Sequence, residues 1–194
     1  SIASGQTTGF FTTRGADIVG PEGKTILLQG INIGNWLVPE GYMFKFDSAT
    51  SPRKINEVLA ELVGPEAVQA FWKQYRDNYI THEDIRFIKR TGLNSIRVPF
   101  NWRLFATDDS PQIWTGPGFE MLDRILAWCT EENLWVVLDM HCAPGGQTGD
   151  NIDDSWGYPF LFESPQSQRT MVELWRRIAD RYKNERILIG YDLM

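Results

Sequence analysis

The sequence has only two cysteines, two histidines and no long apolar run, and each shortage excludes a class of protein. Cys129 and Cys142 are too few for a disulfide framework, so we expect two free thiols. No uninterrupted apolar run approaches the roughly 20 residues of a membrane-spanning helix, so we expect no membrane partner. No cluster of His, Cys and carboxylates has metal-ligand spacing, and we expect neither a metal nor another cofactor.

Positive charge is also scarce. Lys and Arg number 19 against 25 Asp and Glu, which gives a net charge of −6 and a pI of about 5.0. A nucleic-acid partner would call for a clustered basic face, so we expect none. Residues 1–6 have neither the basic start nor the apolar centre of a secretory signal. A mature secreted chain would look the same, so the compartment stays open.

Tryptophan, in contrast, is abundant, with eight residues. Its flat apolar faces and its hydrogen-bonding edge suit the C–H faces of sugar rings. Three tryptophans fall in apolar helical stripes and are expected in the core: Trp72, Trp128 and Trp175. Four lie in loop-like sequence and are candidates for ligand contact: Trp36, Trp102, Trp114 and Trp156.

Short apolar strands alternate with helical patterns along the chain. The expected strands are Ile26–Ile33, Ser95–Phe100, Leu134–Met140 and Ile187–Leu193. The expected helices are Pro52–Leu62, Pro65–Tyr79, 82–90, 118–132 and Pro165–Tyr182. A capping box of Thr81 and Asp84 begins the third helix, and Gly92 follows its end.

Residues 9–28 are expected to form a β-hairpin, in which Phe10–Thr13 and Lys24–Leu28 flank a turn at Gly20–Gly23. We expect a single domain over residues 1–194. Residues 1–28 would hold the hairpin and the start of the first strand, and residues 26–194 the four strands and their helices.

Alternating strands and helices predict an α/β fold with a parallel sheet and right-handed crossovers. A doubly wound sheet and a (β/α)8 barrel both fit this pattern. The loops favour the barrel, because connections that follow strands are long and those that follow helices are short. No glycine-rich phosphate fingerprint follows the first strand, which weakens the nucleotide-binding alternative.

Polar residues stand at the carboxyl ends of the expected strands, where parallel strands would bring them to one mouth. These are Asn32–Trp36, Arg97, Asp139, His141 and Asp192. Arg97 needs a carboxylate partner on a buried strand, so it serves either a site or a structural ion pair with Asp139 or Asp192. His141 could be a general base, a substrate hydrogen-bonder or a satisfied core histidine.

Three stretches carry a resemblance to a known family: Gly30–Leu37, Gly92–Phe100 and Val137–Gln147. Together they resemble the family 5 glycoside hydrolases, especially the exo-β-1,3-glucanase-like branch. The resemblance implies the N-terminal (βα)4 half of a TIM barrel, preceded by the hairpin, and an enzyme that acts on β-linked glucan. Such enzymes often work outside the cell, so secretion is plausible for the parent enzyme.

The resemblance also implies residue roles. Arg97 looks like the family arginine that keeps the nucleophilic carboxylate ionised. His141 looks like the histidine that contacts sugar hydroxyls in the −1 subsite. Glu40 and Tyr42 resemble pocket-lining residues of the exoglucanase branch, and Asp150 and Asn151 fall where it places a sugar-binding Asn. Asn35 and Trp36, in the first matching stretch, complete the candidate substrate-binding set.

Retaining enzymes of this family use two Glu residues about 5 Å apart. The acid/base would follow an Asn just after the fourth strand, beyond Met194, and the nucleophile would end strand seven. We therefore expect no catalytic Glu in this chain and no hydrolysis by the chain alone. Expected substrates of the intact enzyme are β-1,3- or mixed β-glucans.

Two further hypotheses stay open. The chain could be a non-catalytic sugar-binding module that keeps a partial pocket. It could also be a structural half-barrel. Because strands one and four would have open edges, we expect two copies to pair through them as a homodimer that completes an eight-stranded barrel.

Overall fold

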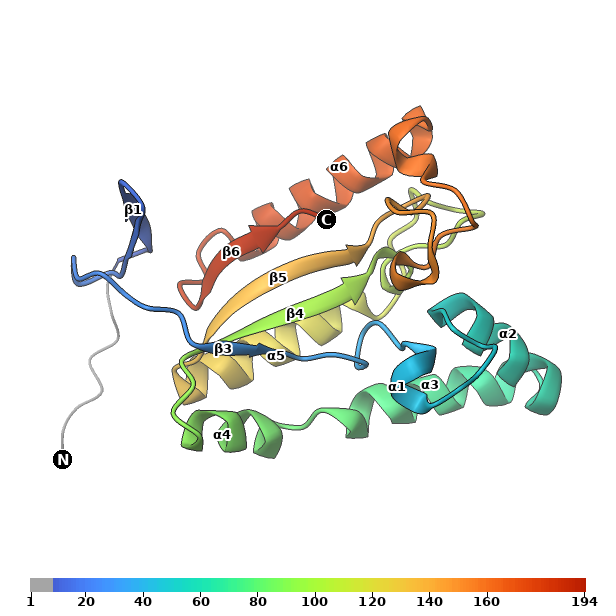
Figure 1. Cartoon of the computed structure of the whole chain (residues 1–194), viewed down its shortest axis with the longest axis horizontal. Helices are drawn as coiled ribbons and strands as arrows, with labels where there is room; N and C mark the ends of the chain where they lie inside the picture. Colours follow the sequence, from blue (N-terminus) through green and yellow to red (C-terminus); the bar gives the residue numbers. More distant parts are fainter. Residues whose placement is uncertain (1–8) are drawn as a thin grey trace.

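The computed structural model describes residues 9–194 and contains a four-stranded parallel sheet in the order β3-β4-β5-β6 (Figure 1). Its strands are β3 (Gly30–Asn32), β4 (Ser95–Asn101), β5 (Trp135–Cys142) and β6 (Leu188–Asp192). The helices are α1 (Gly41–Phe44), α2 (Pro52–Val63), α3 (Pro65–Tyr79), α4 (His82–Arg90), α5 (Gly118–Glu132) and α6 (Pro165–Tyr182). Three short 3-10 helices lie in the loops: η1 (Trp102–Leu104), η2 (Asn151–Asp153) and η3 (Phe160–Phe162). The α/β class and the parallel sheet are as predicted.

Local signals explain why the helices begin and end where they do. Helices α2, α3 and α6 each begin with Pro, whose fixed φ suits the first helical turn. Ser51 and Ser164 accept backbone N–H bonds at the starts of α2 and α6. The predicted capping box of Thr81 and Asp84 is present at α4.

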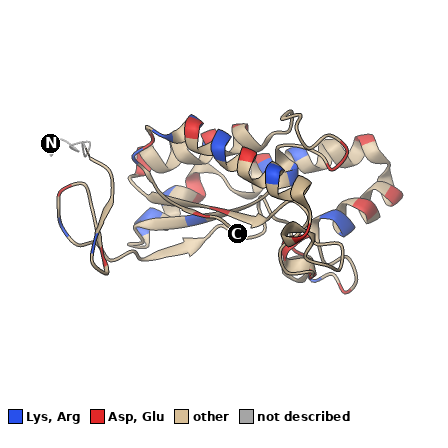
Figure 2. Ribbon diagram, turned by 90° about the horizontal axis from the view of Figure 1, so that it is seen from above, with Lys and Arg blue, Asp and Glu red and all other residues tan. Residues whose placement is uncertain are grey.

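The main core lies between the sheet and helices α4, α5 and α6. Its fully buried members include Val98 and Leu138 from the strands and Ile85, Leu122 and Ile178 from the helices. A smaller cluster joins α2 to α3. Lys and Arg alternate with Asp and Glu along the outer helix surfaces (Figure 2).

The four strands are in parallel register, which aligns their carboxyl ends. Asn32 pairs with Arg97, Pro99 with Asp139, and Asp139 with Asp192. In Figure 1 helices α1 and α2 and the loop after β5 lie at this end, which we call the mouth. Polar residues at the tips of different strands therefore face one region.

The N-terminal hairpin differs from its prediction, and residues 1–8 of the predicted domain lie outside the described residues. Strand β1 (Thr12–Arg14) pairs with β2 (Asp17–Val19) across a two-residue turn that contains Gly15 at φ +63°. The chain does reverse at 20–23, but Val19 and Thr25 then form a single bridge instead of a second strand pair. The predicted turn at Gly20–Gly23 is present, but the predicted hairpin strands on either side of it are not the ones that pair.

The first strand of the sheet is also shorter than Ile26–Ile33. Asn94 explains how the preceding segment is held without a ladder: its side chain accepts from Gln29 N at 2.8 Å and donates to Leu27 O at 2.8 Å. A side-chain clamp therefore replaces two strand hydrogen bonds before β3 begins.

Both cysteines are buried free thiols, Cys129 in α5 and Cys142 at the end of β5. Burial raises the pKa of the Cys129 thiol to about 12. Over residues 9–194, no helix combines the length and the apolar character that crossing a bilayer requires.

Candidate functional site

Four predicted polar residues meet at the mouth, and we call them the mouth cluster: Arg97, Asp139, His141 and Asp192. One oxygen of Asp139 lies 2.9 Å from both Arg97 Nη2 and His141 Nδ1. Arg97 Nε and Nη2 also donate to Asp192 Oδ2 at 3.0 and 2.8 Å. Both ion pairs that the sequence offered as alternatives are formed, and they join three strands.

Asp139 is the centre of this cluster, because its side chain is fully buried. A buried carboxylate is costly unless it is paired, and Arg97 and His141 provide the pairing. Its other oxygen, Oδ1, is buried and has no hydrogen-bond partner among the described residues. Among the described residues, the negative charge of Asp139 is therefore paired through Oδ2 alone.

The contact with Asp139 determines which nitrogen of His141 remains free. Nδ1 donates to the carboxylate, so Nε2 is left for another group. The hydrogen bond to Asp139 raises the pKa of His141, partly opposed by burial and by Arg97, while the charges of Asp139 and Glu40 raise it further. His141 is consequently biased toward the protonated form, a donor toward the mouth.

Glu40 lies within electrostatic range of His141, because the charge of each affects the pKa of the other. Burial raises the pKa of its carboxyl group, partly opposed by the charge of His141. Its backbone N–H donates to Asn35 Oδ1 at 2.8 Å. Tyr42, two residues further in α1, has an exposed side chain.

Asn35 and Trp36 were expected to contact substrate, but both side chains are buried in the structure. Asn35 is 3% exposed, with φ at +60°, and its backbone oxygen accepts from Tyr75 Oη. Trp36 is 1% exposed, and its indole N–H donates to Arg76 O at 2.9 Å. Both residues are therefore buried supports of the loop that carries Glu40.

The other loop tryptophans divide in the same way. Trp102 is buried and Trp114 is partly buried against the main core. Trp156 alone among the four candidates is exposed, at 55%. The loop pattern did not distinguish them, because burial depends on which segments the fold brings together. Trp72 is buried, and Trp128 and Trp175 pack against the core as expected.

Asp150 and Asn151 lie next to the Glu40 loop. Asn151 Nδ2 donates to Thr50 O at 3.3 Å, and the same oxygen accepts from Gly41 N at 3.1 Å. The Asp150 side chain accepts from Asn151 N at 2.6 Å and is otherwise exposed. The segments that carry Glu40 and Asn151 are therefore tied to one backbone oxygen.

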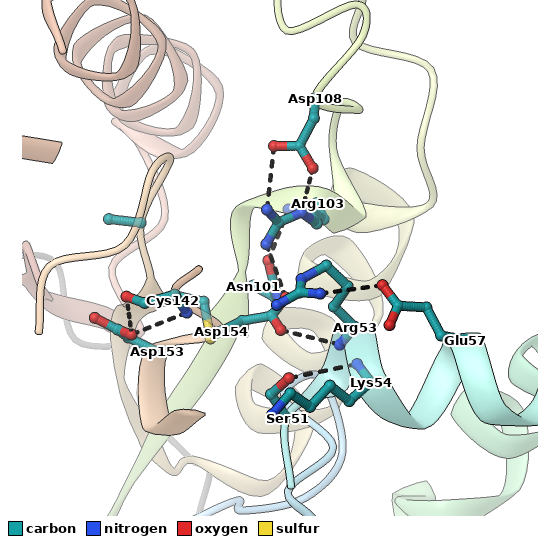
Figure 3. A network of polar contacts seen from close by, with 12 residues as sticks. Ser51, Arg53, Lys54, Glu57, Asn101, Arg103, Asp108, Cys142, Asp153 and Asp154 are labelled. Carbon is teal, nitrogen blue, oxygen red and sulfur yellow. Dashed lines mark hydrogen bonds and ion pairs between the residues drawn. The ribbon is translucent and has the colours of Figure 1, made fainter. Parts of the chain in front are cut away.

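A second polar network, centred on Asp154, was not anticipated from the sequence (Figure 3). Its buried carboxylate accepts from Arg53 N at 2.9 Å, Asn101 Nδ2 at 3.2 Å and Arg103 Nη1 at 2.7 Å. Arg103 also binds Asp108. The network joins the loops that follow β3, β4 and β5. An Asp in a polar loop gives no periodic signal, so nothing in the sequence singled it out.

The described residues hold no group of three or more His, Cys, Asp or Glu arranged to bind a metal ion. The mouth cluster instead offers a guanidinium and a proton-biased imidazole, and the half-buried carboxyl group of Glu40 lies within electrostatic range of that imidazole. Such a set can bind hydroxyl groups from both donor and acceptor sides.

Comparison with known proteins gives this arrangement a family. The sequence model described as Cellulase (glycosyl hydrolase family 5) matches residues 56–194. The chain belongs to glycosyl hydrolase family 5. That match covers most of the chain, including three of the four strands of the sheet and every member of the mouth cluster.

Individual relatives of this family 5 chain are enzymes of several names. A β-xylosidase of Phanerodontia chrysosporium is 32% identical over 94% of this chain and 38% of its own length. Endoglucanase C of Acetivibrio thermocellus is 38% identical over 65% of this chain and 35% of its own. A probable glucan 1,3-β-glucosidase A of Aspergillus fumigatus is 30% identical over 80% of this chain and 38% of its own. The chain thus spans little more than a third of these relatives.

Among solved structures, the crystal structure of rutinosidase from Aspergillus niger superposes with a TM-score of 0.69 at 20% identity. The match covers 84% of this chain and 47% of that one. At this identity the likeness concerns the fold alone. A partial (β/α)8 barrel is consistent with it, since the family 5 chain matches about half of the larger protein.

Proposed function

We propose that these residues form the sugar-recognition part of a retaining β-glucan hydrolase. The observation that carries the proposal is the mouth cluster, in which Arg97 and His141 share one oxygen of Asp139. An ion-paired cluster placed only for stability would have no need of a free imidazole nitrogen beside a half-buried carboxyl group. In this proposal His141 has the role that the family resemblance implies, and its Nε2 and the Glu40 carboxyl group bind hydroxyl groups of one glucose unit.

Arg97 has a second part in this proposal. A guanidinium that neighbours a catalytic carboxylate keeps it ionised through charge-assisted hydrogen bonds. In this chain Arg97 is held by Asp139 and Asp192, so its planar group is fixed in orientation. Tyr42, Asp150 and Asn151 form the rim through which the glucan enters.

We assign the two catalytic glutamates to sequence that the curated relatives have and these 194 residues do not span. Hydrolysis with retention needs two carboxyl groups about 5 Å apart on either side of the scissile bond. The chain by itself is then expected to bind glucan without turning it over. A version extended through eight strands would hydrolyse a β-glucan, and the bare chain would leave the same substrate intact.

The substrate we propose is a β-1,3- or mixed-linked glucan. Support comes from the similarity to a probable glucan 1,3-β-glucosidase and from two loops, Pro39–Met43 and Ala143–Asn151, that resemble the exoglucanase branch. The similarity to an endoglucanase keeps β-1,4-linked glucan as the comparison substrate.

Titration with oligosaccharides tests the site. Laminari-oligosaccharides should shift the ¹⁵N signals of His141 with a dissociation constant of about 1 mM or tighter, the weak end of specific binding. When binding is measured by calorimetric titration, His141→Ala should abolish it, whereas His82→Ala, at a histidine that pairs with Glu132, should not. If neither laminari- nor cello-oligosaccharides shift the His141 signals, the proposal is wrong.

Self-association is a second proposal, favoured by the outer strands of the sheet. On β3 the side chain of Ile31 is 50% exposed, and Leu193, just after β6, is 56% exposed. Exposed apolar residues at strand edges invite pairing with another chain. We therefore propose a two-fold homodimer that joins β3 of one copy to β6 of the other. Sedimentation of a folded monomer at micromolar concentration would contradict it.

A further inference from the structure

Trp156 is an exposed indole that packing does not explain. It belongs to the loop after β5, and 55% of its surface is accessible. The Arg53 guanidinium lies over the ring, 3.5 Å from its centroid. Since one face is covered and half of the surface is still accessible, the opposite face is open. Exposing a Trp face costs hydrophobic free energy, so a ring held open is a candidate for ligand contact.

The ring is held in a set orientation by the Asp154 network. Arg53 donates its backbone N–H to Asp154 and stacks its side chain on Trp156, while its Nη1 binds Glu57 at 3.1 Å. Asp154 and Gly157 both have positive φ, and they bracket the tryptophan. Trp156 therefore loses little rotational freedom on binding a ligand, which favours affinity.

A cavity of about 320 Å³ adjoins the ring. Its wall includes Lys54, Asp150, Asn151 and Trp156. The volume is at the lower end of small-molecule sites and suits one sugar ring. The wall combines the flat face of Trp156 with two cationic side chains, Arg53 and Lys54, one anionic side chain and one amide, so hydroxyl groups can both donate and accept hydrogen bonds there. Asp150 offsets the charge of Lys54, and Glu57 offsets that of Arg53, so the balanced charges favour a neutral ligand over an anion.

The position of the cavity relates it to the mouth. Thr50, whose oxygen binds both Gly41 and Asn151, also lines this cavity. Gly41 directly follows Glu40, whose charge acts on His141. Thr50 therefore connects the segment that carries Glu40 to the cavity beside Trp156.

From this geometry we infer that Trp156 is a second sugar-stacking position, which binds a further glucose unit of the oligosaccharide held by His141 and Glu40. The inference rests on the proposed function, because it takes the same glucan as ligand. It assigns Trp156 a role in chain-length specificity. Long glucans gain the stacking contact, and short ones do not reach it.

The experiment uses the full 194-residue chain labelled with 5-fluorotryptophan, and Trp156→Phe assigns the ¹⁹F signal of Trp156. Laminaribiose should shift the ¹⁵N signals of His141 and leave the ¹⁹F signal of Trp156 in place. Laminaritetraose should shift both, with one saturation curve. Trp156→Ala should weaken tetraose binding about tenfold, equivalent to about 1.4 kcal/mol, and change disaccharide binding less than twofold.

Two variants control for indirect effects. Tyr158→Ala alters an exposed aromatic residue of the same loop that does not line the cavity, and should leave tetraose binding within twofold. Trp156→Phe keeps a flat ring and should retain most of the affinity. A tetraose that shifts His141 but not Trp156 would overturn the inference and leave the proposed function standing. Equal weakening of both sugars by Trp156→Ala would also overturn it. If neither signal moves, the proposed function fails and the inference falls with it.

Discussion

At the scale of single residues, Asp139 decides how the mouth is charged. Its carboxylate is fully buried and binds Arg97 from β4 and His141 from its own strand, β5. Removing the charge would leave the Arg97 guanidinium with Asp192 as its remaining carboxylate and free the imidazole to rotate. Much of the orientation of the candidate site therefore depends on a residue that need not touch sugar.

Asp139→Asn should lower the free energy of unfolding by about 3 kcal/mol, the range observed when one partner of a buried ion pair is removed. The same change should lower the pKa of His141, because its largest upward cause is the hydrogen bond to Asp139. Denaturant unfolding and ¹H–¹⁵N NMR titration measure the two effects. Asp180→Asn removes an exposed partner of Lys183 and should change neither. An unchanged His141 pKa in Asp139→Asn would contradict the assigned contact.

Stability should also depend on pH through His141. Its pKa in the folded chain is raised above the ordinary value of about 6.5, so the protonated form stabilises the fold. That contribution is fully present below about pH 6.5 and is lost as the pH rises through the raised pKa. Denaturant midpoints measured from pH 5.5 upward should therefore fall, and the fall should be smaller in His141→Asn. Equal slopes in the two proteins would argue against the raised pKa.

At the scale of elements, the mouth is built from loops that must be tied together. Asp154, in the loop after β5, achieves this by accepting hydrogen bonds from the segment after β3 and from the end of β4 and the turn that follows it. Loops without such ties are the mobile parts of most proteins. The network therefore explains why Trp156 and Asn151 keep fixed positions although they lie in long polar loops.

Asp154→Asn keeps the shape and tolerates the positive φ but removes the charge that binds Arg103. We expect a loss of about 2 kcal/mol in unfolding free energy, below the roughly 3–5 kcal/mol of a fully buried pair, because the Arg103 side chain is 20% exposed. Amide hydrogen exchange at 149–157 and near Arg53 should become faster. Asp108→Asn removes the exposed partner of the same guanidinium and should cost less than about 1 kcal/mol. Exchange that is unaltered by Asp154→Asn would show that the loops are held by other contacts.

Contact between β3 and β4 imposes a second constraint at this scale. A Cβ at Gly30 would collide with the backbone and side chain of Ser95, whereas a Cβ at Gly190 in β6 would meet only Val137 at an ordinary 3.8 Å. Gly30→Ala should therefore destabilise the fold by about 2 kcal/mol, as overpacking does, and Gly190→Ala by less than about 0.5 kcal/mol. Thermal or denaturant unfolding compares the two, and similar losses would mean that β3 shifts without cost.

At the scale of the whole molecule, the sheet edges determine how the chain behaves in solution. If two copies join through β3 and β6, a charge on the edge should separate them, because lysine at an edge opposes strand pairing. Ile31→Lys should raise the dimer dissociation constant at least tenfold in sedimentation experiments. Ile18→Lys, at an exposed residue of the N-terminal hairpin, should leave it unchanged. Equal dimerisation of both variants would place the interface elsewhere.

Much of the fold was predictable because its signals are local. Helices α3, α5 and α6 span the predicted residues, and Pro at the first turn marks the start of α3 and α6. The hairpin was predicted in the wrong segments, because β1 and β2 pair across the turn that contains Gly15 and not across the turn at Gly20–Gly23. Only the pairing partner distinguishes them, and it is not a local property.

The candidate site was predictable in part for a similar reason. Arg97, His141, Asp139 and Asp192 were found from the sequence because a charge inside an apolar strand is conspicuous, and parallel strands align their ends. Trp36 and Trp102 were misjudged, and Asp154 was overlooked, because a loop sequence does not say which side chains it buries.

The sequence by itself determined the order of strands and helices, the family, and the set of polar residues at the strand ends, since periodicity, capping and motif are written in neighbouring residues. The tertiary structure alone decided which tryptophan stays exposed, which carboxylate is buried and which loops share a hydrogen-bond network. Burial and pairing depend on residues that are far apart along the chain, and for these the fold must bring the partners together first.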